Sequence, residues 1–67
     1  MTKYEVISNH GSSIFYDFDD AVSAMVLLAD YHPELDVRRR DVEHQLRTHG
    51  RYEAFPLEVS AFDDPGI

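Results

Sequence analysis

Few residues of this 67-residue chain have the types and spacing that chemistry at an active site requires. Cysteine is absent, which excludes disulfides, thiolate nucleophiles and thiolate metal sites. His44 and His49 are five residues apart, which misses the i, i+4 spacing of a helical metal-binding pair. Ser12 and Ser13 have no visible base or orienting group to form a nucleophilic triad. We therefore expect no catalytic residue, no metal site and no cofactor.

Charge is the most informative global feature of the sequence. The formal net charge is −7, but residues 1–37 carry −6, residues 38–51 carry +3 and residues 52–67 carry −4. An acidic protein thus contains one basic segment, which holds five of the six cationic side chains. Two candidate binding surfaces follow, one acidic and one basic.

The acidic candidate surface surrounds the first predicted helix and the turn after it. Its carboxylates would complement a basic groove on a partner protein, including a groove built for nucleic acid. In size and charge the chain resembles small phage-type inhibitors that imitate phosphate, which implies an inhibitor or accessory factor docking on a larger assembly. The candidate residues are Asp19, Asp20, Asp30, Glu34 and Asp36 for the acidic surface, with Leu27, Tyr31 and Tyr52 as aromatic and apolar anchors.

The alternative function is a small nucleic-acid-associated regulator that uses the basic segment. Its arginines could contact phosphates, and two successive helices could present them to a groove. The turn between the helices is longer than the three-to-four-residue turn of DNA-binding helix–turn–helix motifs. A net charge of −7 also repels nucleic acid, so the sequence favours the protein partner. The candidate basic residues are Arg38, Arg39, Arg40, Arg47 and Arg51.

Turn signals and apolar periodicity predict five elements in the order ββααβ. We expect an α+β fold in which a small three-stranded sheet carries two helices packed on one face. The domain should span residues 1–62, followed by a flexible tail at 63–67. The predicted strands are Tyr4–Ile7, Ile14–Tyr16 and Tyr52–Phe62, and the predicted helices are Phe18–Tyr31 and Arg38–His49.

Helix ends are predicted from capping residues and from proline and glycine. Asp17 and Asp36 are the expected N-caps of the first and second helix. Pro33 ends the first helix, and Gly50 stops the second. The turn at 8–13 joins the first two strands, because it is rich in serine, asparagine and glycine.

The first predicted helix has more apolar surface than one neighbour can cover. The residues expected on its main apolar side are Phe18, Ala21, Val22, Met25, Leu28 and Ala29. Leu27 projects away from that side. Either the sheet and the second helix cover both flanks, or the part edged by Leu27 and Tyr31 is an interface for a partner or a second copy. The second reading predicts a homodimer through residues 18–31. In the second helix the expected apolar stripe is thin, consisting of Val42, Leu46 and His49.

A cytoplasmic location without membrane contact is the simplest expectation. No charged leader with an apolar stretch follows Met1. The longest nearly apolar run, Ala21–Ala29, is far shorter than the roughly 20 residues that cross a bilayer.

Overall fold

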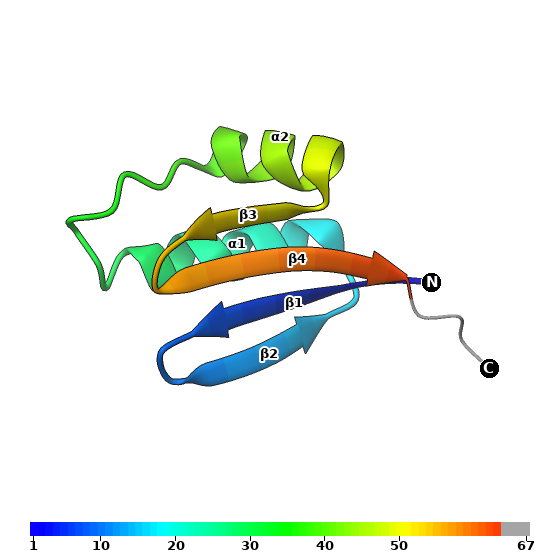
Figure 1. The fold of residues 1–67 in the computed structure, drawn as a ribbon, viewed down its shortest axis with the longest axis horizontal. Coiled ribbons are helices and arrows are strands. Elements are labelled where there is room, and N and C mark those ends of the chain that lie inside the picture. Colours follow the sequence, from blue (N-terminus) through cyan, green and yellow to red (C-terminus); the bar gives the residue numbers. More distant parts are fainter. Residues whose placement is uncertain (64–67) are drawn as a thin grey trace.

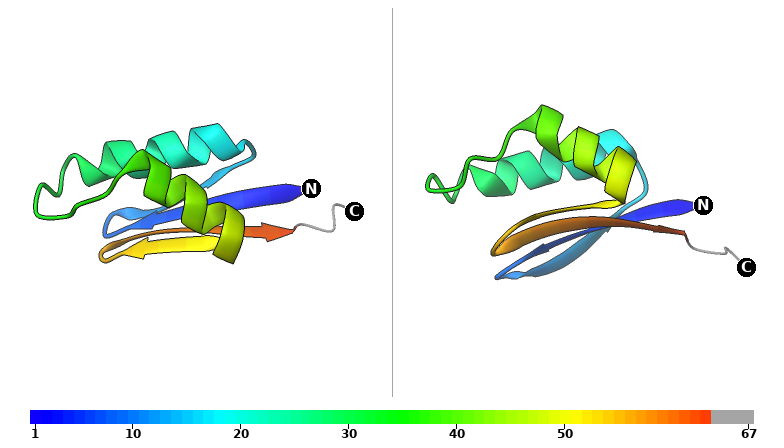
Figure 2. Two further views of the ribbon diagram at one scale, coloured as in Figure 1. Left: turned by 90° about the horizontal axis from the view of Figure 1, so that it is seen from above. Right: turned by 45° about the horizontal axis from the view of Figure 1, so that its top comes forward.

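Four strands and two helices follow one another in the order ββααββ in the computed structural model, which describes residues 1–63 (Figure 1). The strands form one antiparallel sheet in the order β2-β1-β4-β3. Both helices lie on the same face of this sheet, and no element formed by residues 1–63 covers the other face (Figure 2). The elements are β1 (Thr2–Ser8), β2 (Gly11–Phe15), α1 (Phe18–Ala29), α2 (Arg39–His49), β3 (Arg51–Ala54) and β4 (Leu57–Asp63).

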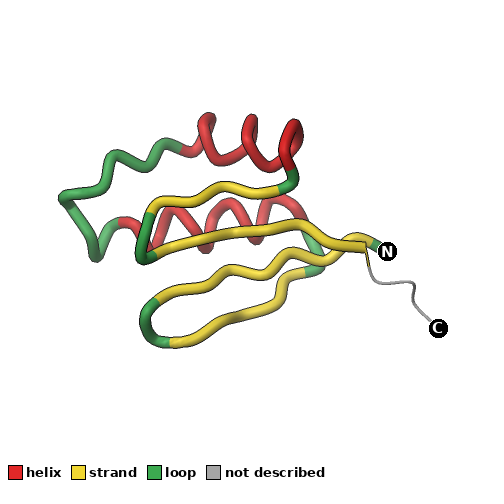
Figure 3. The backbone as a smooth tube through the Cα atoms, in the orientation of Figure 1, coloured by secondary structure: helices red, strands yellow, loops and turns green. Residues whose placement is uncertain are grey.

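The α+β class is confirmed, but the predicted three-stranded ββααβ order is wrong in detail. The segment Tyr52–Phe62 forms two strands, β3 and β4, joined by a turn at Phe55 and Pro56 (Figure 3). Pro56 has no N–H to donate to a strand ladder, so pairing stops there. The chain doubles back, and Ala54 pairs with Leu57. The sheet therefore has four strands.

The first hairpin is tighter than the sequence predicted. Its loop consists of Asn9 and His10 alone, because Ser8 already pairs with Gly11. Gly11 has a φ of 135°, a conformation that favours glycine. The serines after it pair with β1, so the second strand is Gly11–Phe15 and not Ile14–Tyr16. The predicted turn at 8–13 was thus too long.

The core lies between the helices and the sheet, and it confirms the predicted apolar side of α1 and, except for His49, that of α2. Its buried members are Val6, Ala21, Val22, Met25, Ala29, Val42, Leu46, Leu57 and Val59. Leu27 is exposed, as predicted, whereas His49 is exposed although the sequence placed it on the apolar stripe of α2. The stripe of α2 is therefore only Val42 and Leu46.

Capping explains where the helices begin and end. The Asp17 carboxylate accepts a hydrogen bond from the Asp20 backbone N–H at 3.1 Å, which confirms Asp17 as the N-cap of α1. The second predicted cap, Asp36, is wrong: Arg38 is the N-cap of α2, and no side chain makes the capping hydrogen bond. Gly50 ends α2 in the left-handed conformation, with a φ of 74°.

The first and last described strands lie at the centre of the sheet. β1 pairs with β4 from Thr2 opposite Asp63 to Ile7 opposite Glu58. The Thr2 hydroxyl donates to the Asp63 carboxylate at 3.1 Å. Asp63 thus belongs to the sheet, although the sequence assigned it to the tail at 63–67. The rest of that predicted tail, residues 64–67, lies outside the described residues.

Candidate interaction surfaces

The outward side of α1 carries the largest exposed apolar side chains in the helix layer. The core residues of α1 face the sheet, so residues half a turn away face solvent. Leu27 is 64% exposed, and Tyr31, just beyond the helix, is 81% exposed. Asp20 and Asp30 are exposed near them at helical spacing. We call Asp20, Leu27, Asp30 and Tyr31 the α1 ridge.

The predicted acidic surface divides into paired and unpaired carboxylates. Within residues 1–63, the side chains of Asp20 and Asp30 have no cationic partner. The other three carboxylates each lie near a basic side chain: Asp19 is 4.0 Å from Arg39, Glu34 is 3.5 Å from the His32 imidazole, and Asp36 is 3.4 Å from Arg38. The unpaired acids are therefore the two that belong to the α1 ridge.

The arginines of the basic segment are largely engaged with groups of the same chain. Arg39 is 3.2 Å from Glu43 and donates to the Ser23 hydroxyl of α1 at 3.0 Å. The guanidinium of Arg47 lies 4.6 Å from the centre of the Phe18 ring. A phosphate would have to compete with these contacts, and among residues 1–63 only Arg40 of the five candidate arginines has no such partner.

Arg51 does not join the other arginines in one patch. It lies on the sheet face opposite the helices, where its guanidinium is 3.0 Å from Glu53 and 2.8 Å from Glu58. The neighbouring Tyr52 faces the helices, since it pairs with buried Val59. The predicted basic surface is thus split between α2 and the open sheet face.

Tyr52 is likewise separated from the other predicted anchors. It is half-buried on the edge strand β3 and packs against the core, whereas the α1 ridge points away from the sheet. Burial raises the pKa of the Tyr52 hydroxyl, and the carboxylates of Asp41 and Asp36 raise it further. Tyr52 therefore packs on the helix-facing side of β3 and is not part of the α1 ridge.

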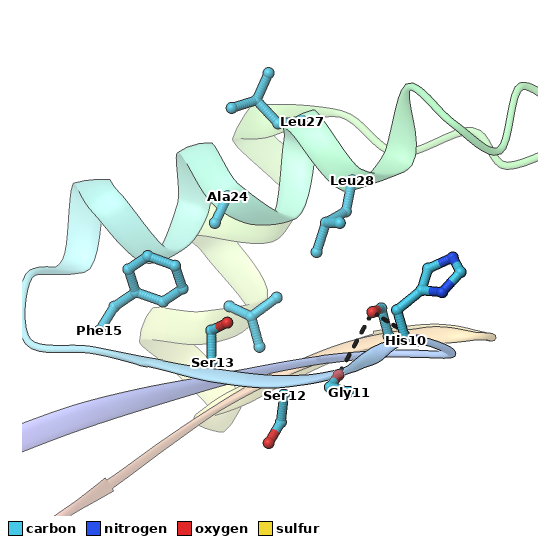
Figure 4. Close-up of a pocket in the computed structure, with 10 residues that line it drawn as sticks. His10, Gly11, Ser12, Ser13, Phe15, Ala24, Leu27 and Leu28 are labelled. Carbon is cyan, nitrogen blue, oxygen red and sulfur yellow. Dashed lines mark hydrogen bonds between the residues drawn. The ribbon is translucent and has the colours of Figure 1, made fainter.

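An apolar groove, which the sequence did not reveal, runs between α1 and the edge strand β2. It encloses about 410 Å³ and is lined from the helix by Ala24, Leu27 and Leu28, and from the strand by Ser13 and Phe15. Leu28 and Ala24 point toward β2, while Leu27 points away from the sheet at the rim (Figure 4). The signal that could have revealed it is the polar sequence of β2, which we interpreted as a turn.

The described residues show no arrangement suited to metal chemistry or to crossing a membrane. Across residues 1–63, no three or more histidine, aspartate or glutamate side chains gather as a set that could hold a metal ion. In the same part of the chain, neither helix combines the length and the apolar content that a membrane span needs.

Comparisons with known proteins return no relative. No family model matches the chain, and no curated protein and no solved structure matches it. Geometry and charge are therefore the only basis for a function.

Proposed function

We propose that this protein is a non-enzymatic protein-interaction module that docks on a larger partner through the α1 ridge. The observation that carries the proposal is the exposure of Leu27 and Tyr31, at 64% and 81%, between two carboxylates without a cationic partner in residues 1–63. Large apolar and aromatic side chains supply most of the binding energy in protein interfaces. Uncompensated charges around them direct the encounter with a partner of opposite sign.

The chemistry of the α1 ridge supports one kind of partner. Asp20 and Asp30 favour a basic surface, and Leu27 and Tyr31 require apolar pockets within it. A basic groove with apolar pockets meets both requirements, which is consistent with an inhibitor or accessory factor that occupies such a groove. The net charge of −7 adds a long-range attraction to a basic partner.

The alternative, nucleic-acid binding through the basic segment, has weaker support. Within residues 1–63, the arginines on α2 and before it contact Asp36, Glu43 and the Phe18 ring, except for Arg40, which has no such contact. Contact through one arginine gives little affinity for a polyanion, because each neutralised phosphate contributes separately. A protein partner therefore fits the distribution of charge better.

Affinity capture with matched variants tests the proposal. Leu27→Ser combined with Tyr31→Ser removes the apolar anchors without touching the core, and it should abolish capture of the proteins that the wild-type chain retains. The matched control is Arg40→Gln with Arg47→Gln, which changes two exposed residues of α2. This control should retain the same partners.

The opposite pattern would overturn the proposal. If the arginine variant loses the captured partner and the serine variant keeps it, the basic surface is the functional one. A gel-shift assay at physiological salt then decides whether the partner is nucleic acid, since that affinity falls steeply as salt rises. Asp20→Asn with Asp30→Asn should slow association with a protein partner more than it speeds dissociation.

A further inference from the structure

The two edges of the sheet are protected unequally. Edge strand β3 is four residues long, carries Arg51 and Glu53, and is flanked by α2. Edge strand β2 consists of Gly11–Phe15 and contains no charged residue and no proline. Charges, prolines and covering elements are the features that keep exposed edges from pairing with other strands. β2 has none of the sequence features that would block such pairing.

The open edge of β2 lies beside the apolar groove described above. The helix α1 contacts β1, β2 and β4, but among residues 1–63 no second helix lies beyond α1 on the β2 side (Figure 2). Phe15 and Ser13 therefore line the groove on the same side as Leu28. A strand added to β2 would place every second side chain over this groove.

We propose that the added strand is β2 of a second copy of this chain, paired antiparallel about a two-fold axis at Ser13. This register pairs all five residues of β2 and sets Phe15 of each copy opposite Gly11 of the other. The space around Gly11 is open, with no atom within 4 Å of an added Cβ position. The phenyl ring of one copy therefore has room beside the glycine of the other, on the groove side.

Polar groups at the two ends of the groove complement each other in this arrangement. Asp17 and Asp20 lie at the start of α1, next to the Phe15 end of β2. His10 and His32 lie at the opposite end, where they line a neighbouring hollow with Leu28. The two-fold axis brings the acids of each copy toward the imidazoles of the other. An unrelated peptide strand would not bring acids to the histidine end of the groove and imidazoles to its acidic end.

The same geometry leaves Leu27 and Tyr31, the apolar anchors of the α1 ridge, accessible, whereas Asp20 faces the other copy. β1 of one copy and β1 of the other are three strand spacings apart, or about 14 Å at about 4.8 Å each. Helices above them are then farther apart than the roughly 8–10 Å of directly packed helices. The contact is made by the strands and by side chains such as Leu28, so Leu27 and Tyr31 of both copies stay on the outer surface. The dimer thus leaves the two apolar anchors of the proposed partner site on the outer surface and shares only Asp20 with it.

Charge substitution at the axis tests the pairing. Ser13 is exposed and meets itself across the axis, so Ser13→Glu and Ser13→Lys each place two like charges together. Sedimentation equilibrium should give about twice 7.7 kDa for the wild type at micromolar concentration and 7.7 kDa for each variant. An equimolar mixture of the two variants should recover the doubled mass, because opposite charges then meet. Leu27→Ser with Tyr31→Ser should remain dimeric.

Amide hydrogen exchange on the wild type provides a second measurement that needs no variant. Exchange of β2 amides should slow as concentration rises from micromolar to millimolar, whereas β3 amides should not change. A wild-type mass of 7.7 kDa throughout that range would overturn the dimer while leaving the proposed partner site intact. A doubled mass that Ser13→Glu and Ser13→Lys both preserve would also overturn it, since the contact would then lie elsewhere.

Discussion

Replacing Met25 with alanine should destabilise the fold strongly, whereas the same change at Leu27 should be nearly neutral. The two residues are neighbours on α1, but Met25 is 0% exposed and Leu27 is 64% exposed. Truncating a buried methionine to alanine costs about 2–5 kcal/mol in the free energy of unfolding, through lost burial and the cavity left behind. A chain of this length has a total stability of roughly 3–10 kcal/mol. Met25→Ala therefore removes a large part of it.

The estimate for Leu27 is much smaller. A fully buried leucine contributes about 1.5–3 kcal/mol, and Leu27 covers only about a third of its surface, so its contribution is at most about 1 kcal/mol. The higher helix propensity of alanine offsets part of that loss.

Urea denaturation followed by circular dichroism measures both changes. The free energy of unfolding of a small protein falls by about 1 kcal/mol per molar urea. The urea concentration at the unfolding midpoint should therefore fall by about 2 M or more for Met25→Ala. The midpoint for Leu27→Ala should move by well under 1 M, on the order of the change expected for a surface site. Equal losses in the two variants would refute the register of α1, and with it the assignment of Leu27 to the α1 ridge. Both measurements should be made at one protein concentration, because self-association adds to apparent stability.

Two further predictions concern a helix cap and a partly buried hydroxyl. Asp17→Ala should lower the free energy of unfolding by about 1 kcal/mol, because the Asp20 N–H loses its acceptor. Asp17→Ser should retain most of it in the same urea assay, and equal losses would contradict a capping role. The raised pKa of Tyr52 means that the unfolded chain releases this proton first. Stability should therefore decline as pH rises above about 10, the ordinary tyrosine value. Tyr52→Phe should show a shallower decline in thermal melts, and an identical pH profile would refute the assignment.

Features fixed by neighbours in the sequence could be predicted, whereas pairings between distant segments could not. Asp17 and Gly50 bound their helices as expected, because capping depends on a few adjacent residues. The turn at Phe55 and Pro56 was missed, since an apolar Phe55 continues the alternation of the strand that follows it. Ser12 resembles a turn residue locally, and only its pairing with Ile7 shows that it lies in a strand.

The candidate site could be predicted only in part, because it also combines local features with contacts between distant segments. Helical periodicity alone placed Leu27 on the solvent side of α1. The neutralisation of Asp19 by Arg39 depends on how α2 packs against α1, which no local pattern encodes. The groove beside β2 depends on the order of strands in the sheet, so it could emerge only from the three-dimensional structure.

The central pairing of β1 with β4 affects how the chain can fold during synthesis. Thr2 and Asp63 are 61 residues apart in the chain, so β1 must wait for the rest of the domain before it gains this partner. Contacts that close such long loops form late and slow the folding reaction. Until β4 leaves the ribosome, Val6 has only one of its two cross-strand partners, Ser13, and the hairpin of β1 and β2 leaves its two outer strand edges unpaired. We therefore expect chains in which β4 has not yet paired with β1 to be more prone to aggregation than the folded domain.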